Sequence, residues 1–242
     1  MRAGVKVARW GRNGAAAVAL SLAGCGGAAG PPPGSWVHPS FGARQLEGES
    51  IVVLPVGSVS ETDGSLPSDT LAAALALRAG EALADGLASG GAAGRAVRPV
   101  VAIVELATLS AEEVRTLYDP LTPALLDPSF AGEIPGPPPV WRDVTDRTGQ
   151  RYFLVPKSLA IARLEPLRVR ATFDAWLVDG ASATVLWHAW IAAVNEHAPS
   201  GAAADVYGAA LDDAIAAAVS TLASRLARLA RTGTDDFEAA VP

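Results

Sequence analysis

The chain has 242 residues, half of them hydrophobic and 18% charged, and its formal net charge is −6 at pH 7. This length suits one domain with a short leader. A negative chain is repelled by nucleic-acid phosphates, and a single cysteine leaves no disulfide framework or cysteine-rich metal site, so these classes are set aside.

A secretory signal is predicted over residues 1–24. Its basic head carries Arg2, Lys6, Arg9 and Arg12 without an acidic residue, and an apolar run of eight residues follows. That run is about half of the roughly 20 residues needed to cross a bilayer, which argues against an uncleaved anchor. Cleavage removes four positive charges and no negative one, and so changes the net charge from −6 to −10.

The signal ends in Leu22-Ala23-Gly24-Cys25, which resembles a bacterial lipobox. The resemblance implies that the thiol of Cys25 is acylated with diacylglycerol and that the chain is cut just before it. The alternative is an inert buried thiol. Gly26 implies the periplasmic face of the outer membrane, by resemblance to sorted lipoproteins, whose retention in the inner membrane usually needs an acidic residue at that position.

A flexible tether is predicted over residues 25–48. The stretch is rich in Gly, Ala and Pro and cannot bury enough apolar surface to offset the entropy of ordering it. Trp36, Val37 and Phe41 interrupt it. These three side chains are expected either to dock on the domain or to lie at the membrane surface, and docking is the preferred interpretation.

An α+β domain is predicted over residues 49–232, with a C-terminal tail over 233–242. In its first half, a β-branched apolar run predicts a strand, leucines at helical spacing predict a helix, and glycine-rich segments predict where the helix ends. The expected elements are a buried strand over 51–56, a polar loop over 57–67, a helix over 68–89, a strand over 97–106 and a short helix over 110–117.

A proline-rich excursion is predicted over residues 121–139. Loops beyond about 15 residues are usually functional or mobile. This segment therefore carries a rival hypothesis, in which the protein is a periplasmic hydrolase or carbohydrate-active enzyme with its site here. A third hypothesis is a lipoprotein that binds a small ligand in an apolar cavity.

The second half of the domain is predicted as strands followed by a long helix. A turn-rich joint suggests a hairpin of 140–144 with 151–155. Period-two alternation predicts a strand over 167–178, which the turn at Asp179-Gly180 joins to a strand over 185–194. Leucines at threes and fours predict a final helix over 202–231. The fold class is thus a mixed sheet of about five strands, with the final helix packed on it.

Two stretches carry a family resemblance. The strand over 51–56 followed by a helix, and the segment over 179–187, are similar to bacterial lipoproteins related to the curli-secretion lipoprotein and the lipoprotein activator of penicillin-binding proteins. Val56 and Ala183 depart from the group's pattern, which has an aromatic residue and a turn glycine there. The resemblance implies a helix-covered sheet and a non-catalytic role in binding or assembling an envelope protein complex.

No catalytic, cofactor or metal residue is predicted. The chain has neither a Gly-x-Ser-x-Gly elbow nor a complete phosphate-binding loop, although residues 90–95 are glycine-rich. His38, His188 and His197 form no zinc-type pair, and His188 is interpreted as a satisfied sheet residue. The acidic pairs at 112–113, 212–213 and 235–236 are interpreted as solvated, because adjacent helical residues point in different directions.

The tryptophans of the last two strands support one further hypothesis. One face of the strand over 167–178 carries Arg168, Arg170 and Trp176. These side chains would suit a partner surface, since Trp and Arg are enriched at interface hot spots. The competing interpretation is that Trp176, Trp187 and Trp190 fill the core against the final helix, because large aromatic side chains are mostly buried.

Overall fold

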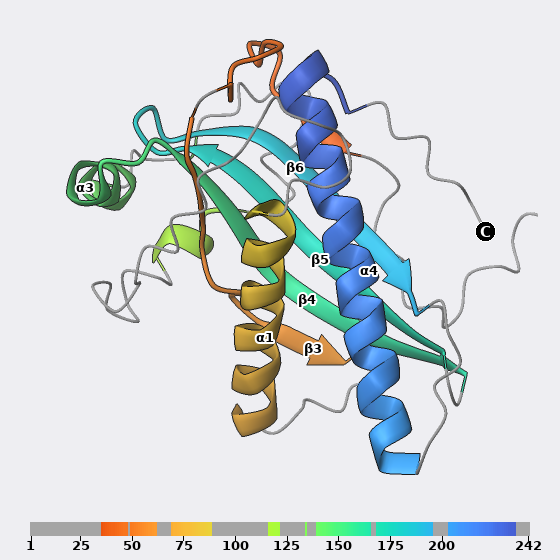
Figure 1. The fold of residues 1–242 in the computed structure, drawn as a ribbon. Coiled ribbons are helices and arrows are strands. Elements are labelled where there is room, and N and C mark those ends of the chain that lie inside the picture. The colour runs from red at the N-terminus through yellow and green to blue at the C-terminus, as the bar shows by residue number, and fades with distance from the viewer. Residues whose placement is uncertain are drawn as a thin grey trace, which may run out of the picture. The chain divides into compact units, whose positions relative to one another are not determined.

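The computed structural model describes residues 35–47, 49–61, 69–88, 116–121, 134, 139–165, 168–195 and 203–235. All of them belong to one compact unit, residues 33–242. Within it a mixed six-stranded sheet is packed with helices, which confirms the predicted α+β class (Figure 1). The elements are β1 (Ser35–Val37), β2 (Ile51–Val53), β3 (Val59–Glu61), α1 (Asp69–Ala88), α3 (Pro139–Thr148), β4 (Tyr152–Glu165), β5 (Arg168–Asp179), β6 (Thr184–Val194) and α4 (Ala203–Thr232).

The sheet is built around the antiparallel strands β4, β5 and β6. Its order is β1-β6-β5-β4-β2, and β3 also pairs with β4. Both β2 and β3 run parallel to β4, at residues 152–154 and 159–161 respectively. The chain over 51–61 therefore follows the edge of β4 twice. The prediction of a loop from residue 57 was wrong at 59–61, while the predicted strand over 97–106 lies outside the described residues.

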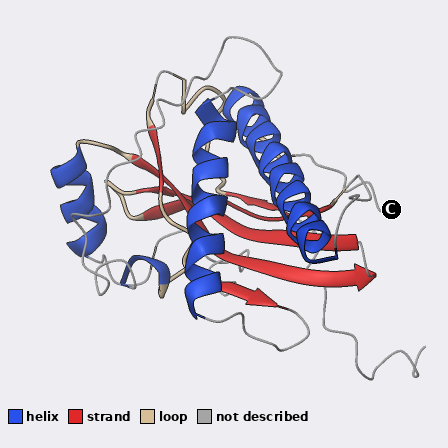
Figure 2. Ribbon diagram, turned by 60° about the horizontal axis from the view of Figure 1, so that its bottom comes forward, coloured by secondary structure: helices blue, strands red, loops and turns tan. Residues whose placement is uncertain are grey.

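The main core lies between one face of the sheet and the helices α1 and α4, which Figure 2 shows on the same side of the strands. Both helices present buried residues at helical spacing, as predicted, including Leu75 and Leu83 in α1 and Leu222 and Leu226 in α4. Each such side chain contributes roughly 1.5–3 kcal/mol when removed from water. By length and composition residues 206–232 could also cross a membrane, but half of the most apolar stretch of this helix is buried within the protein.

A second core lies under α3, at one end of the opposite face. The hairpin predicted for 140–144 with 151–155 was wrong, because Pro139–Thr148 is helical. Pro139 occupies the first helical position, where its missing N–H costs nothing. Trp141 and Val144, three residues apart, are both buried on the inner side of this helix. At its end the Gly149 N–H donates to the Thr145 carbonyl, and Gly149 has a φ of 65°. Residues that resemble a hairpin turn therefore form the end of a helix.

The domain begins earlier than predicted, because residues 35–47 are packed against it. β1 pairs with residues 187–189 of β6, and Phe41 and Leu46 are buried in the main core. The prediction of a tether as far as residue 48 was therefore wrong for this stretch. The preferred docking of Trp36, Val37 and Phe41 is confirmed, since each contacts a core cluster.

Residues just after α4 are also fixed to the domain, by a buried ion pair. Arg225 donates from Nε to Oδ1 of Asp235 at 3.0 Å and from Nη2 to Oδ2, and Trp187 Nε1 donates to Oδ2 at 2.7 Å. Ser35 Oγ donates to the Asp235 carbonyl at 3.1 Å, which links β1 to the same point. The interpretation of Asp235 as solvated, in a tail over 233–242, was wrong. Its neighbour at 236 lies outside the described residues.

Acid is expected to weaken this ion pair. Burial alone raises the pKa of Asp235, but hydrogen bonds from Arg225 and Trp187 to the carboxylate outweigh it and hold the pKa below the usual 3.8. The carboxylate thus stabilises the fold fully above pH 3.8. This contribution is lost as the pH falls through the lowered pKa, because the unfolded chain binds the proton first.

Urea unfolding of wild type and Asp235→Asn between pH 2 and 7 measures this effect. The stability difference between the two proteins should be constant above about pH 5 and shrink below pH 3.8. A difference that does not depend on pH would contradict the assignment.

Candidate partner-binding surface

Part of one sheet face is covered by none of the described helices α1, α3 and α4, although Thr172 and Ala162 on it are buried. Residues directly opposite each other on paired strands point to the same side, so the register defines this face. We call it the open face. Its three rows, in the order β4, β5, β6, are Ser158, Asp174 and Trp190; Ala160, Thr172 and Ala192; and Ala162, Arg170 and Val194.

An aromatic cluster lies where the open face meets the second core. Its centre is His188. The centroid of its ring lies 4.2 Å from the ring centroid of Trp176 and 4.1 Å from that of Trp190. Trp36 of β1 is the strand neighbour of His188 on the other side. Trp176 is fully buried, whereas Trp36 and Trp190 are half-buried, so two of the three tryptophans reach solvent.

Asp174 joins this cluster through one carboxylate oxygen. Its Oδ1 lies 2.7 Å from His188 Nε2 and accepts a hydrogen bond from Trp176 Nε1, also at 2.7 Å. The side chain is 13% exposed. Nearby Lys157 lies at an irregularity of β4, and burial lowers its pKa although the charges of Asp174 and Asp119 act in the opposite direction. His188 is only 1% exposed, so a substrate has no access to its ring from solvent.

Arg170 lies two rows away from Asp174 on the same strand. The side chain is half-buried, and its Nε is buried without a hydrogen-bond partner. A buried donor without a partner costs about 1–3 kcal/mol, and more when it is charged. The open face therefore holds a guanidinium group whose hydrogen-bonding capacity is not used within the described residues.

The hypothesis of a partner surface formed by Trp176, Arg168 and Arg170 needs one correction. Trp176 has no exposed surface and belongs to the second core, so it cannot contact a partner. Arg168 is exposed and Arg170 half-buried, and the register places both on the face that the alternation predicted. Trp187 fills the main core against α4, as the competing interpretation expected.

Other predicted chemistry is resolved only in part. Asp212 is an exposed residue paired with Arg78, as expected of a solvated face. The interpretation of His188 as a satisfied sheet residue is confirmed. His197 and the segments 90–95 and 112–113 lie outside the described residues. In the part of the chain that the structure describes, no three His, Cys, Asp or Glu side chains are arranged to hold a metal ion.

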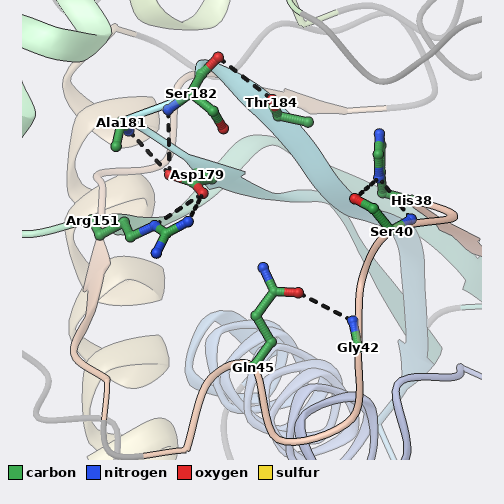
Figure 3. Close-up of polar contacts among 9 residues, drawn as sticks. All are labelled: His38, Ser40, Gly42, Gln45, Arg151, Asp179, Ala181, Ser182 and Thr184. Atoms are coloured by element: carbon green, nitrogen blue, oxygen red, sulfur yellow. Dashed lines mark hydrogen bonds and ion pairs between the residues drawn. The ribbon is translucent and has the colours of Figure 1, made fainter.

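The turn between β5 and β6 is held by a buried carboxylate (Figure 3). Oδ2 of Asp179 accepts from Nε and Nη2 of Arg151 at 3.0 and 2.7 Å, and Oδ1 accepts from the backbone of Ala181. A Cβ at Gly180 would lie 2.5 Å from Cε2 of Phe153, so the turn requires glycine there. Ala183 has a φ of 53°, a value that glycine adopts more easily.

A second polar group lies on the loop after β1 and is drawn in the same view. His38 Nδ1 is 2.7 Å from Ser40 Oγ, and Gln45 accepts a hydrogen bond from the Gly42 N–H at 3.1 Å. These contacts are local to the loop. They fix its shape and bring no reactive groups together, so the open face remains the candidate site.

No protein-family model and no curated protein sequence matches this chain. Among solved structures it is similar to the PelC dodecamer from Paraburkholderia phytofirmans, with 16% identity over 76% of this chain and 97% of that one, and a TM-score of 0.31. It is also similar to the LpoB C-terminal domain from Salmonella enterica, with 16% identity over 62% and 86% and a TM-score of 0.29. Similarity at this level is distant and says nothing about function.

Proposed function

We propose that this protein is a lipid-anchored periplasmic lipoprotein of the outer membrane, which binds or helps assemble an envelope protein complex without catalysis. The observation that carries the proposal is the open face. It combines small side chains with the half-buried Trp190 and Arg170, and the half-buried Trp36 belongs to the aromatic cluster at its edge. Such a composition is typical of protein interfaces. The pair of Asp174 with His188 serves packing, because His188 is buried between the rings of Trp176 and Trp190.

The anchor is tested by Cys25→Ala. Expressed in a bacterial host, the wild type should incorporate labelled palmitate and sediment with the membranes, because the lipobox cysteine is the acylation site. The variant should lose the label and leave the membrane fraction. Arg9→Ala, which leaves the cleavage site intact, is the matched control. A Cys25→Ala protein that stays labelled would contradict lipidation at this residue.

The partner surface is tested by photocrosslinking in intact cells. A photoreactive amino acid at position 192, exposed on the open face, should crosslink the lipidated protein to another envelope protein. The same amino acid at position 216, exposed on α4, is the control. Equal crosslinking from both positions, or none from 192 with the protein folded and lipidated, would contradict binding through the open face.

A further inference from the structure

The open face carries two charged groups of opposite sign whose binding capacity is not used within the described part of the domain. Asp174 uses Oδ1 for His188 and Trp176, and no described residue donates a hydrogen bond to Oδ2. Arg170 has a buried Nε without a partner. Neither side chain forms an ion pair with a described Lys, Arg, Asp or Glu. Asp174 is 13% exposed and is not among the buried unsatisfied groups of the described residues, whereas the Nε of Arg170 is. Buried polar groups are almost always satisfied, so Arg170 needs an explanation.

The two groups are held at a fixed spacing. Asp174 and Arg170 are four residues apart on β5 and point to the same face, which places them about 13 Å apart along the strand. Thr172 lies between them. The strand is central in the sheet, with β4 on one side and β6 on the other, so the separation cannot relax as it could on a loop.

The surroundings of Asp174 suit a cation. Trp190 is directly opposite on β6, and its half-buried ring contacts that of His188, which is hydrogen-bonded to the carboxylate. A guanidinium or ammonium group that reaches Oδ2 therefore also meets an aromatic surface, and the two attractions add. Lys157 of the same chain is close enough to interact electrostatically but donates no hydrogen bond to Asp174.

The surroundings of Arg170 suit an anion. Val194 and Ala162 are its strand neighbours, and neither offers an oxygen to the guanidinium from its side chain. The Nε of Arg170 is buried, so a carboxylate of a partner can accept hydrogen bonds only from its two Nη groups. The arrangement is thus complementary to a protein surface with a basic and an acidic side chain about 13 Å apart.

On the basis of the proposed function, we infer that the open face docks a folded partner protein that presents a basic side chain to Asp174 and an acidic side chain to Arg170. Trp190 and Trp36 supply the apolar contact beside the basic residue. The two opposite charges fix the direction in which the partner lies along β5, since a reversed partner places like charges together.

The test uses the crosslink from position 192 as its readout, in the full lipidated chain. Asp174→Asn keeps an oxygen for His188 and Trp176 but removes the charge, and Arg170→Met keeps the apolar stem. Each variant should reduce the crosslink yield about tenfold, as expected for removing one partner of a close charge pair. Arg228→Met, at an exposed arginine of α4 outside the open face, should leave the yield unchanged.

The decisive step is a charge exchange. The crosslinked peptide identifies the partner's contact residues. Arg170→Glu should abolish the crosslink, and replacing the partner's contacting acidic residue with lysine should restore it. An unchanged yield in Asp174→Asn and Arg170→Met would overturn this inference while leaving the proposed function standing. No crosslink in the wild type would overturn both. Thermal unfolding of each variant confirms that it is folded.

Discussion

Asp235→Ala is expected to lower the free energy of unfolding by about 3–5 kcal/mol, because it leaves the guanidinium of Arg225 buried and uncompensated. The Asp235 side chain is 0% exposed and that of Arg225 is 7% exposed, so water cannot replace the lost carboxylate. The change also removes the acceptor of Trp187 Nε1. Urea unfolding followed by circular dichroism at pH 7 measures the loss.

The double variant Arg225→Met with Asp235→Leu is the matched control. It removes both charges and keeps apolar volume, and buried ion pairs replaced in this way often lose little stability. We expect it to be more stable than Asp235→Ala. A single variant that unfolds at the same urea concentration as the wild type would show that the pair does not hold residues 233–235 to α4.

Trp176→Ala is expected to destabilise the protein by about 3–5 kcal/mol, the usual cost of removing a fully buried Trp. It empties part of the second core between α3 and the sheet, and among the described residues it leaves Asp174 with His188 as its one hydrogen-bond partner. Thermal or urea unfolding gives the value.

Trp190→Ala provides the comparison for Trp176→Ala. Trp190 is half-buried on the open face, so its loss should cost less stability but should reduce the crosslink from position 192. The two tryptophans therefore separate folding from binding. If Trp176→Ala proved as stable as the wild type, the assignment of Trp176 to the core would be wrong.

Elements with long, regular periodicity could be predicted from the sequence. The helices α1 and α4 and the hairpin of β5 with β6 lie within two residues of their predicted bounds. Their hydrophobic spacing is repeated often enough that no local signal competes with it. The helix α3 is only 10 residues long, and its last residues also suit a turn, so local chemistry favoured the wrong structure.

The candidate site could be predicted only in outline, because the register of β5 against β6 contains an irregularity. Pairing counted from the turn would place Trp187 opposite Trp176. The shift between Leu177 and Val178 instead places His188 there and Trp190 opposite Asp174. A shift of one residue exchanges the two faces of a strand. Residue spacing along a single strand contains no information about such a shift, so the role of Asp174 was missed.

The position of β1 sets how far the domain can stand from a membrane. A tether that ended at residue 48 would span up to about 80 Å when fully extended. Because β1 begins at Ser35 and is fixed to β6 and Asp235, the span from an anchor at Cys25 is about 35 Å at most. With the proposed anchor at Cys25, the domain stays close to the bilayer. We therefore expect the proposed partner to reach the layer next to that membrane.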